Sequence, residues 1–109
     1  MAVTETKTYK VKRGDYGYLI PWTLLNADDS AFNLDGYTVH LKVWLPNKPS
    51  QLFVNGECDP VSEPAGTLTY TVAEGDFLEA GTFNAEYEAT KTGEAQSFNT
   101  FQIVVEESP

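Results

Sequence analysis

The stretch TFNAEYEAT, residues 82–90, alternates apolar and polar side chains without a break. Because successive side chains of a β-strand point to opposite faces, this pattern predicts a strand with one buried and one wet face. Shorter alternations recur in YTVHLKVWL (37–45), YLIPWTLL (18–25) and TLTYTV (67–72). No segment has a convincing helical period, and EGDFLEAG (74–81) has room for one turn at most. The sequence therefore predicts an all-β protein.

Turn-forming residues separate these runs, and about seven short strands at this spacing predict an antiparallel β-sandwich. Pro21 lacks an amide hydrogen, which indicates an edge or a bulge in the second strand. The alternation in SFNTFQIVVEE (97–107) changes phase between Phe98 and Phe101, as a β-bulge would make it do. The turn signals are NADDS (26–30), LDG (34–36), PNKP (46–49) and KTGE (91–94), with Pro60 and Pro64 interrupting the connection before Leu68.

The inward rows of these strands define a predicted core. Trp22 is expected to be the most buried large residue, in the central volume between the two sheets. The strand 37–45 is expected to pair with the strand 82–90, which brings Lys42 close to Glu86 or Glu88. The predicted core residues are Ile20, Trp22, Leu24, Val39, Leu41, Val43, Leu68, Tyr70, Val72, Phe83, Ala85 and Tyr87.

Length and composition fit one domain spanning residues 1–109, with flexible ends expected at 1–5 and 107–109. Hydrophobic residues make up 41% of the chain, as in a globular protein. Cys58 is the only cysteine, so no internal disulfide forms and folding in a reducing compartment is expected. The start, MAVTETKTYKVKR, has no apolar run long enough for a signal peptide or a membrane span.

The net charge of −9 argues against a nucleic-acid-binding function, because phosphates require a cationic surface. The charge is spread unevenly along the chain. Residues 1–56 hold six Lys/Arg and five Asp/Glu, whereas residues 57–109 hold one lysine and eleven Asp/Glu. One interpretation is a soluble domain kept monomeric by its charge, and the other is two oppositely charged faces used for docking.

Catalytic and metal-binding signals are weak. His40 and Cys58 are each unique and lie far apart in the sequence, so no nucleophilic pair is indicated, and no CxxC spacing is present. No cofactor is expected. Calcium stays open as an alternative, because some sandwich domains bind it in acidic loops, but no DxDxDG run supports it. The acidic loop residues are Asp28, Asp29, Asp35, Glu74, Asp76 and Glu79.

The order of these elements resembles the immunoglobulin-like sandwich of phage tail and baseplate proteins, typified by the N-terminal domain of the upper baseplate protein. A glycine-aspartate turn leads into TLLNADDSAFNLDGYTVHLKVW (23–44), and GTLTYTVAEGDFLEAGTFNAEYEAT (66–90) follows before a final strand. The family positions are Leu24-Leu25-Asn26, the run Leu34 to Val39, and Asp76 with Gly81-Thr82-Phe83, within a resemblance covering roughly residues 10–106. The departures are Phe83 and Asp35, where the family usually has tyrosine and threonine, and Trp22 in a row of smaller residues.

The resemblance implies a non-enzymatic module of a phage virion, located in the tail, baseplate or fibre, that docks to other virion proteins and forms a ring or trimer. It also places Arg13-Gly14-Asp15, the tripeptide that integrins recognise, in the turn between the first two strands, where glycine is permissive. A carbohydrate-binding module that uses Trp44, joined by Tyr9, Tyr16 and Tyr18, is the alternative function. The candidate interface residues are the outward row His40, Lys42 and Trp44, and the basic first strand with Lys7, Lys10, Lys12 and Arg13.

Overall fold

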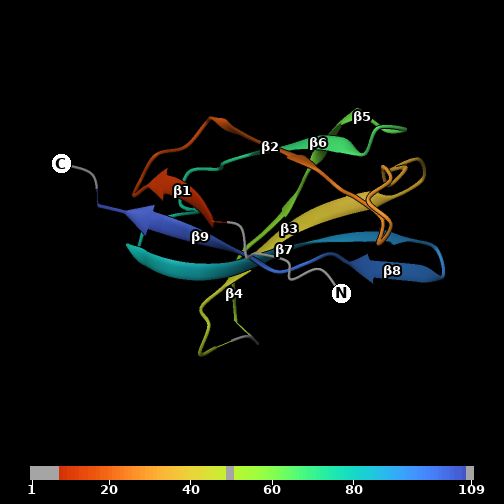
Figure 1. Ribbon diagram of the computed structural model, residues 1–109. Coiled ribbons are helices and arrows are strands. Elements are labelled where there is room, and N and C mark those ends of the chain that lie inside the picture. The colour runs from red at the N-terminus through yellow and green to blue at the C-terminus, as the bar shows by residue number, and fades with distance from the viewer. Residues whose placement is uncertain (1–7, 49–50, 108–109) are drawn as a thin grey trace.

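The computed structural model describes residues 8–48 and 51–107, which form two packed β-sheets (Figure 1). The six-stranded sheet has the order β1-β9-β7-β3-β4, with β8 also paired to β7, and the three-stranded sheet has the order β2-β6-β5. No helix of the described residues is long and apolar enough to cross a membrane. The strands are β1 (Thr8–Lys12), β2 (Leu19–Thr23), β3 (Thr38–Trp44), β4 (Leu52–Glu57), β5 (Asp59–Ser62), β6 (Thr67–Thr71), β7 (Gly81–Lys91), β8 (Glu94–Ser97) and β9 (Phe101–Glu106).

Strands β3 and β7 form the centre of the larger sheet, and they pair antiparallel as the sequence predicts. Lys42 lies directly opposite Glu86 in the register, and His40 lies opposite Glu88. In both strands the apolar residues of the alternation are buried and the polar residues are partly exposed. The all-β sandwich predicted from the alternation is therefore confirmed.

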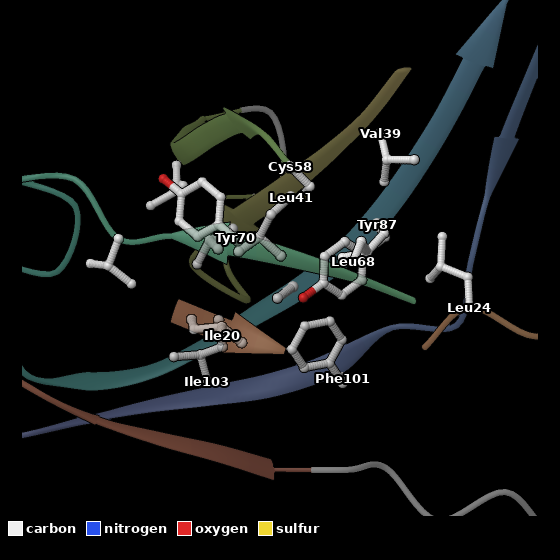
Figure 2. Close-up of a cluster of buried hydrophobic side chains, with 14 of the residues drawn as sticks. Ile20, Leu24, Val39, Leu41, Cys58, Leu68, Tyr70, Tyr87, Phe101 and Ile103 are labelled. Carbon is white, nitrogen blue, oxygen red and sulfur yellow. The ribbon is translucent and has the colours of Figure 1, made fainter. Parts of the chain in front are cut away.

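The core fills the space between the two sheets, and its side chains come from both layers (Figure 2). Eleven of the twelve predicted core residues are buried, the exception being Trp22. Pro21 lies in an edge strand, as predicted, because β2 is at the end of the smaller sheet. The structure adds ten buried apolar residues that the prediction did not include: Val11, Phe32, Leu34, Val54, Cys58, Phe77, Ala89, Phe101, Ile103 and Val105.

The prediction that Trp22 is the most buried large residue is wrong. Trp22 is partly buried at the margin of the core, and Tyr87, which is 1% exposed, is the largest fully buried side chain among the described residues. The ring of Trp22 stacks on Phe101 at a centroid distance of 4.3 Å and lies 5.4 Å from the ring of Tyr87. The predicted strand register holds, because Ile20 and Leu24 are each 1% exposed. Trp22 is on β2, an edge strand with a neighbour on one side, whereas Tyr87 is on β7, which has neighbouring strands on both sides.

The sequence pattern does not predict strands β4 and β5, because the part of the chain around Pro60 and Pro64 is interpreted from sequence as a connection. Strand β4 belongs to the larger sheet and β5 to the smaller one, and Cys58 is the single residue between them. A register shift opposite Val43 and Trp44 interrupts the alternation of β4, and a second shift lies between Pro60 and Ser62 in β5. A strand that changes sheets and carries bulges has no uniform period of two, so the sequence pattern is hidden.

The phase change predicted before Phe101 is present. Strands β8 and β9 pair with the same strand, β7, and residues 98–100 lie between them. Glu88 pairs with Ser97 and Ala85 with Phe101, so three steps along β7 correspond to four steps along the partner. The extra residue shifts the side chains by one position, which accounts for the break in the alternation.

One pairing departs from the antiparallel pattern that the sequence predicts. Strand β1 runs parallel to β9, with Tyr9 opposite Ile103 and Val11 opposite Val105. The two strands are at opposite ends of the described chain, so no short hairpin constrains their relative direction. This pairing puts the basic first strand beside the acidic end of the chain.

Candidate interaction surfaces

The predicted outward row of β3 lies on the outer face of the larger sheet. His40, Lys42 and Trp44 are all partly buried, because the strands on either side cover part of each side chain. The Lys42 Nζ lies 2.8 Å from the Glu88 Oε1, and both side chains are about a quarter exposed (25% and 26%). The predicted proximity of Lys42 to Glu86 or Glu88 is thus confirmed.

We expect the Lys42–Glu88 pair to contribute about 0.2–1 kcal/mol to the free energy of unfolding, the range of ion pairs with access to water. A double-mutant cycle with Lys42→Ala and Glu88→Ala, measured by urea unfolding, gives this coupling energy directly. The coupling should decrease as salt is added, because counterions screen exposed charges. A coupling that is zero at low salt would contradict an energetic role for the pair.

The basic first strand is partly neutralised within the chain. The Lys12 Nζ lies 3.4 Å from the Glu106 Oε1, and the Arg13 Nε lies 2.9 Å from the Glu107 Oε1. Both acids belong to the end of the chain that the parallel β1–β9 pairing brings alongside. Lys10 is exposed on the same outer face as Lys42, with β9 and β7 between their strands, and Lys7 lies outside the described residues.

The Arg13-Gly14-Asp15 tripeptide forms the predicted turn between β1 and β2. Gly14 has a φ of +85°, in the left-handed region that favours glycine. The Gly14 N–H donates to the Phe77 carbonyl oxygen at 2.8 Å, and the Arg13 N–H donates to the Glu106 carbonyl oxygen at 2.8 Å. The tripeptide therefore has a structural role, because its backbone connects the β1–β2 turn to the loop before β7 and to the end of β9.

His40 and Cys58 do not form a reactive pair. They lie near each other across the β3–β4 ladder, but His40 points to the outer face whereas Cys58 is 3% exposed in the core. Burial raises the pKa of the Cys58 thiol from 9.0 to about 12. The thiol is therefore uncharged at neutral pH and is a poor nucleophile.

The raised pKa of Cys58 predicts a loss of stability at high pH. The unfolded chain ionises its thiol near pH 9, whereas the folded chain resists ionisation until about pH 12. This contribution is fully present below pH 9 and is lost as the pH rises through about 12. Urea midpoints of Cys58→Ala should therefore fall less steeply over this range than those of the parent chain. An identical pH dependence of the urea midpoints in the two proteins would contradict the raised pKa of the Cys58 thiol. Burial also raises the pKa values of Tyr18, Tyr70 and Tyr87. These tyrosines are present in both proteins, so the stability of Cys58→Ala should still fall at high pH, but by less than that of the parent chain.

Two of the acidic loop residues considered for calcium, Asp28 and Asp76, accept hydrogen bonds within the chain. Asp28 accepts hydrogen bonds from the backbone N–H and the hydroxyl of Ser30, and these bonds lower its pKa. Asp76 accepts hydrogen bonds from the Tyr70 hydroxyl and from the Ala73 N–H, the latter at 2.9 Å. Within the described ranges, no group of three or more His, Cys, Asp or Glu residues is placed to hold a metal ion.

The aromatic residues considered for sugar binding do not lie on one surface. Trp44 is on the outer face of β3, which β9 and β7 separate from β1, whereas Tyr9 and Tyr18 pack against the core. Tyr16 is 56% exposed in the β1–β2 loop. A platform of adjacent rings, the usual means of stacking on a sugar, is not formed by this set.

A surface that the sequence did not indicate lies beside Phe53 of the edge strand β4, between it and the segment that leads into β7. A hollow of about 220 Å³ is lined by the rings of Phe53, Phe77 and Phe83, by Leu78, and by the segment 75–79. Phe53 is 41% exposed and meets Phe83 edge to face at 5.1 Å, and Leu78 is 59% exposed. A smaller hollow of about 70 Å³ lies near Cys58 and Leu68. The exposure of Phe53 follows from the position of β4 at the edge of the sheet, which no local sequence pattern reveals.

Comparison with known proteins places the fold. No model of a known protein family matches this sequence, and no curated protein matches it. Among solved structures, the N-terminal domain of phage TP901-1 ORF48 is similar, with a TM-score of 0.70 and 16% sequence identity over 92% of this chain and 85% of that chain. CopC from Methylosinus trichosporium OB3b is similar with a TM-score of 0.52 and 13% identity, over 96% of this chain and 88% of that chain. The resemblance to a phage domain inferred from sequence motifs is therefore confirmed at the level of the fold.

Proposed function

We propose that this chain is a non-enzymatic structural module of a phage virion, part of the tail, baseplate or fibre, and that it docks to other virion proteins. The observation that carries the proposal is the agreement between the resemblance in sequence motifs and the match in fold. The motifs resemble phage tail and baseplate domains, and the fold matches a phage domain over 92% of the chain. A fold alone does not give a function, so the proposal depends on this agreement.

The chemistry of the described residues supports a docking role. The unique cysteine is buried in the core, the unique histidine is on the outer face of the larger sheet, and Asp28 and Asp76 accept hydrogen bonds from nearby residues of the chain. Surface complementarity with a neighbouring protein then supplies the function. The proposed interface residues are the outward row of β3 (His40, Lys42 and Trp44) and the basic residues Lys7, Lys10, Lys12 and Arg13. Of these, the β3 row, Lys10 and Lys12 lie on the outer face of the larger sheet.

The test is binding to the tail proteins encoded beside this chain. We expect a stable complex with at least one of them after co-expression and size-exclusion chromatography, and the same chain should show no saturable binding on a glycan array. Analytical ultracentrifugation of the chain alone measures whether it also forms a ring or trimer. Saturable binding to a defined oligosaccharide, abolished by Trp44→Ala, together with no tail-protein complex, would replace this proposal with the carbohydrate-binding alternative.

A further inference from the structure

The free strand edges of the two sheets differ in how they resist pairing with another chain. Unpaired N–H and C=O groups at an edge accept a further strand unless proline, lysine or short length opposes it. Strand β2 carries Pro21, and β5 carries Pro60 and has four residues. Strand β1 carries Lys10 and Lys12, and β8 has four residues. Among the described strands, β4 is the edge that has neither proline nor lysine and is longer than four residues.

The outward-facing backbone groups of β4 can be identified from the ladder. The Cys58 N–H donates to the Val39 carbonyl oxygen at 2.8 Å, so Cys58 faces β3. Hydrogen-bonded pairs alternate along an antiparallel ladder, and therefore the backbone groups of Asn55 and Glu57 point away from β3. The register is regular from Val54 to Glu57, and the bulge is confined to the other end of the strand, near Phe53.

The hollow beside Phe53 gives this edge an apolar anchor site. Leu52, Phe53 and Leu78 expose 42%, 41% and 59% of their surfaces. A single exposed apolar residue is common on a protein surface, whereas three of them gathered near one strand indicate an interaction site. Strand addition combines main-chain hydrogen bonds with a pocket that receives a side chain of the added strand, and both parts are present here.

The negative charge around the hollow favours a partner segment that carries positive charge. The charged residues that line the hollow are Asp76 and Glu79, and Glu57 ends the strand at the same edge. A second copy of this chain carries the same net charge of −9, so long-range repulsion opposes self-pairing. A segment with lysine or arginine beside its apolar anchor is attracted instead.

We propose that the β4 edge receives an extended segment of another virion protein, which adds a strand beside Leu52–Glu57, inserts one large apolar side chain into the Phe53–Leu78 hollow, and places a basic side chain against Glu79. This proposal rests on the proposed function, since it adds a docking surface at the β4 edge to the interface residues proposed above and names the kind of segment that binds there.

Two substitutions test the edge and the hollow separately. Asn55→Pro removes an outward N–H and leaves the β3–β4 ladder intact, because that N–H does not bond to β3. Leu78→Glu puts a charge into the hollow. Val61→Glu is the matched control, because Val61 is a 67% exposed apolar residue on β5. Thermal melts of all three variants establish that they fold.

The probes are the tail protein that binds the parent chain and biotinylated peptides of about 15 residues tiled across it. We expect one basic, apolar peptide to bind, and Asn55→Pro and Leu78→Glu each to weaken binding by about tenfold or more. Val61→Glu should leave the affinity unchanged. Absence of any tail-protein complex would refute the proposed function.

A complex that forms equally well with folded Asn55→Pro and Leu78→Glu would refute the edge proposal alone. A self-associating chain whose dimer is abolished by Asn55→Pro would overturn the proposal by making a second copy the occupant.

Discussion

Gly66→Ala is expected to lower the free energy of unfolding by about 2–5 kcal/mol, which is a large share of the stability of a domain of this size. Gly66 has a φ of +71°, and its amide lies in the turn before β6. A Cβ at this position would lie 2.6 Å from the Leu24 carbonyl oxygen and 2.8 Å from the Phe32 carbonyl oxygen. Both obstacles are backbone atoms, so they cannot move aside as a flexible side chain can.

Gly66 also takes part in the backbone hydrogen bonds that position two buried residues, Leu24 and Phe32. The Leu24 N–H donates to the Gly66 carbonyl oxygen at 2.9 Å, and the Phe32 N–H donates to the Leu24 carbonyl oxygen at 3.0 Å. Displacing Gly66 therefore disturbs the backbone of two buried residues at once. The control is Gly93→Ala, where φ is +80° but no atom lies within 4 Å of the added Cβ. Gly93→Ala should show the left-handed penalty of about 1–2 kcal/mol alone. Equal losses in the two variants, measured by urea unfolding, would show that Gly66 is not crowded.

Tyr87→Ala is expected to cost about 3–5 kcal/mol, the usual range for truncating a large buried aromatic side chain. Tyr87 is 1% exposed, and its ring stacks on Phe101 at a centroid distance of 5.6 Å with the planes 18° apart. Trp22 contacts both rings, so the three aromatic side chains join β2 to β7 and β9 across the core. Removing the central ring leaves a cavity bordered by both sheets.

Tyr87→Phe separates the ring from its hydroxyl. The buried Tyr87 hydroxyl has no hydrogen-bond partner among the described residues, and a buried polar group without a partner is destabilising. Tyr87→Phe should therefore retain the stability of the parent chain or increase it, as measured by the same urea unfolding. A loss of about 1–3 kcal/mol in Tyr87→Phe would instead demonstrate a buried partner for the hydroxyl.

The part of the fold that could be predicted is the part with an uninterrupted period of two. The alternations of β3 and β7 give the strands, their buried faces and the proximity of Lys42 to Glu88, because pairing register follows from which face is buried. The Gly14 turn was predictable for a local reason, since a left-handed residue in a tight turn favours glycine.

The remaining features depend on long-range arrangement. Strands β4 and β5 were hidden because the chain changes sheets at Cys58 and carries bulges on both sides. The burial of Trp22 was overestimated because its strand is at an edge, and strand order is not encoded in alternation. The exposed apolar residues at the β4 edge were missed for the same reason. A surface of this kind becomes visible once the neighbours of each strand are known.

Quantitative mass spectrometry of gradient-purified phage particles tests the central claim, that this chain is a structural part of the virion, most directly. The account predicts peptides of this chain in the particles at a fixed ratio to a tail protein, with the ratio unchanged after a high-salt wash. A chain that is abundant in the infected lysate but absent from the purified particles would contradict the account.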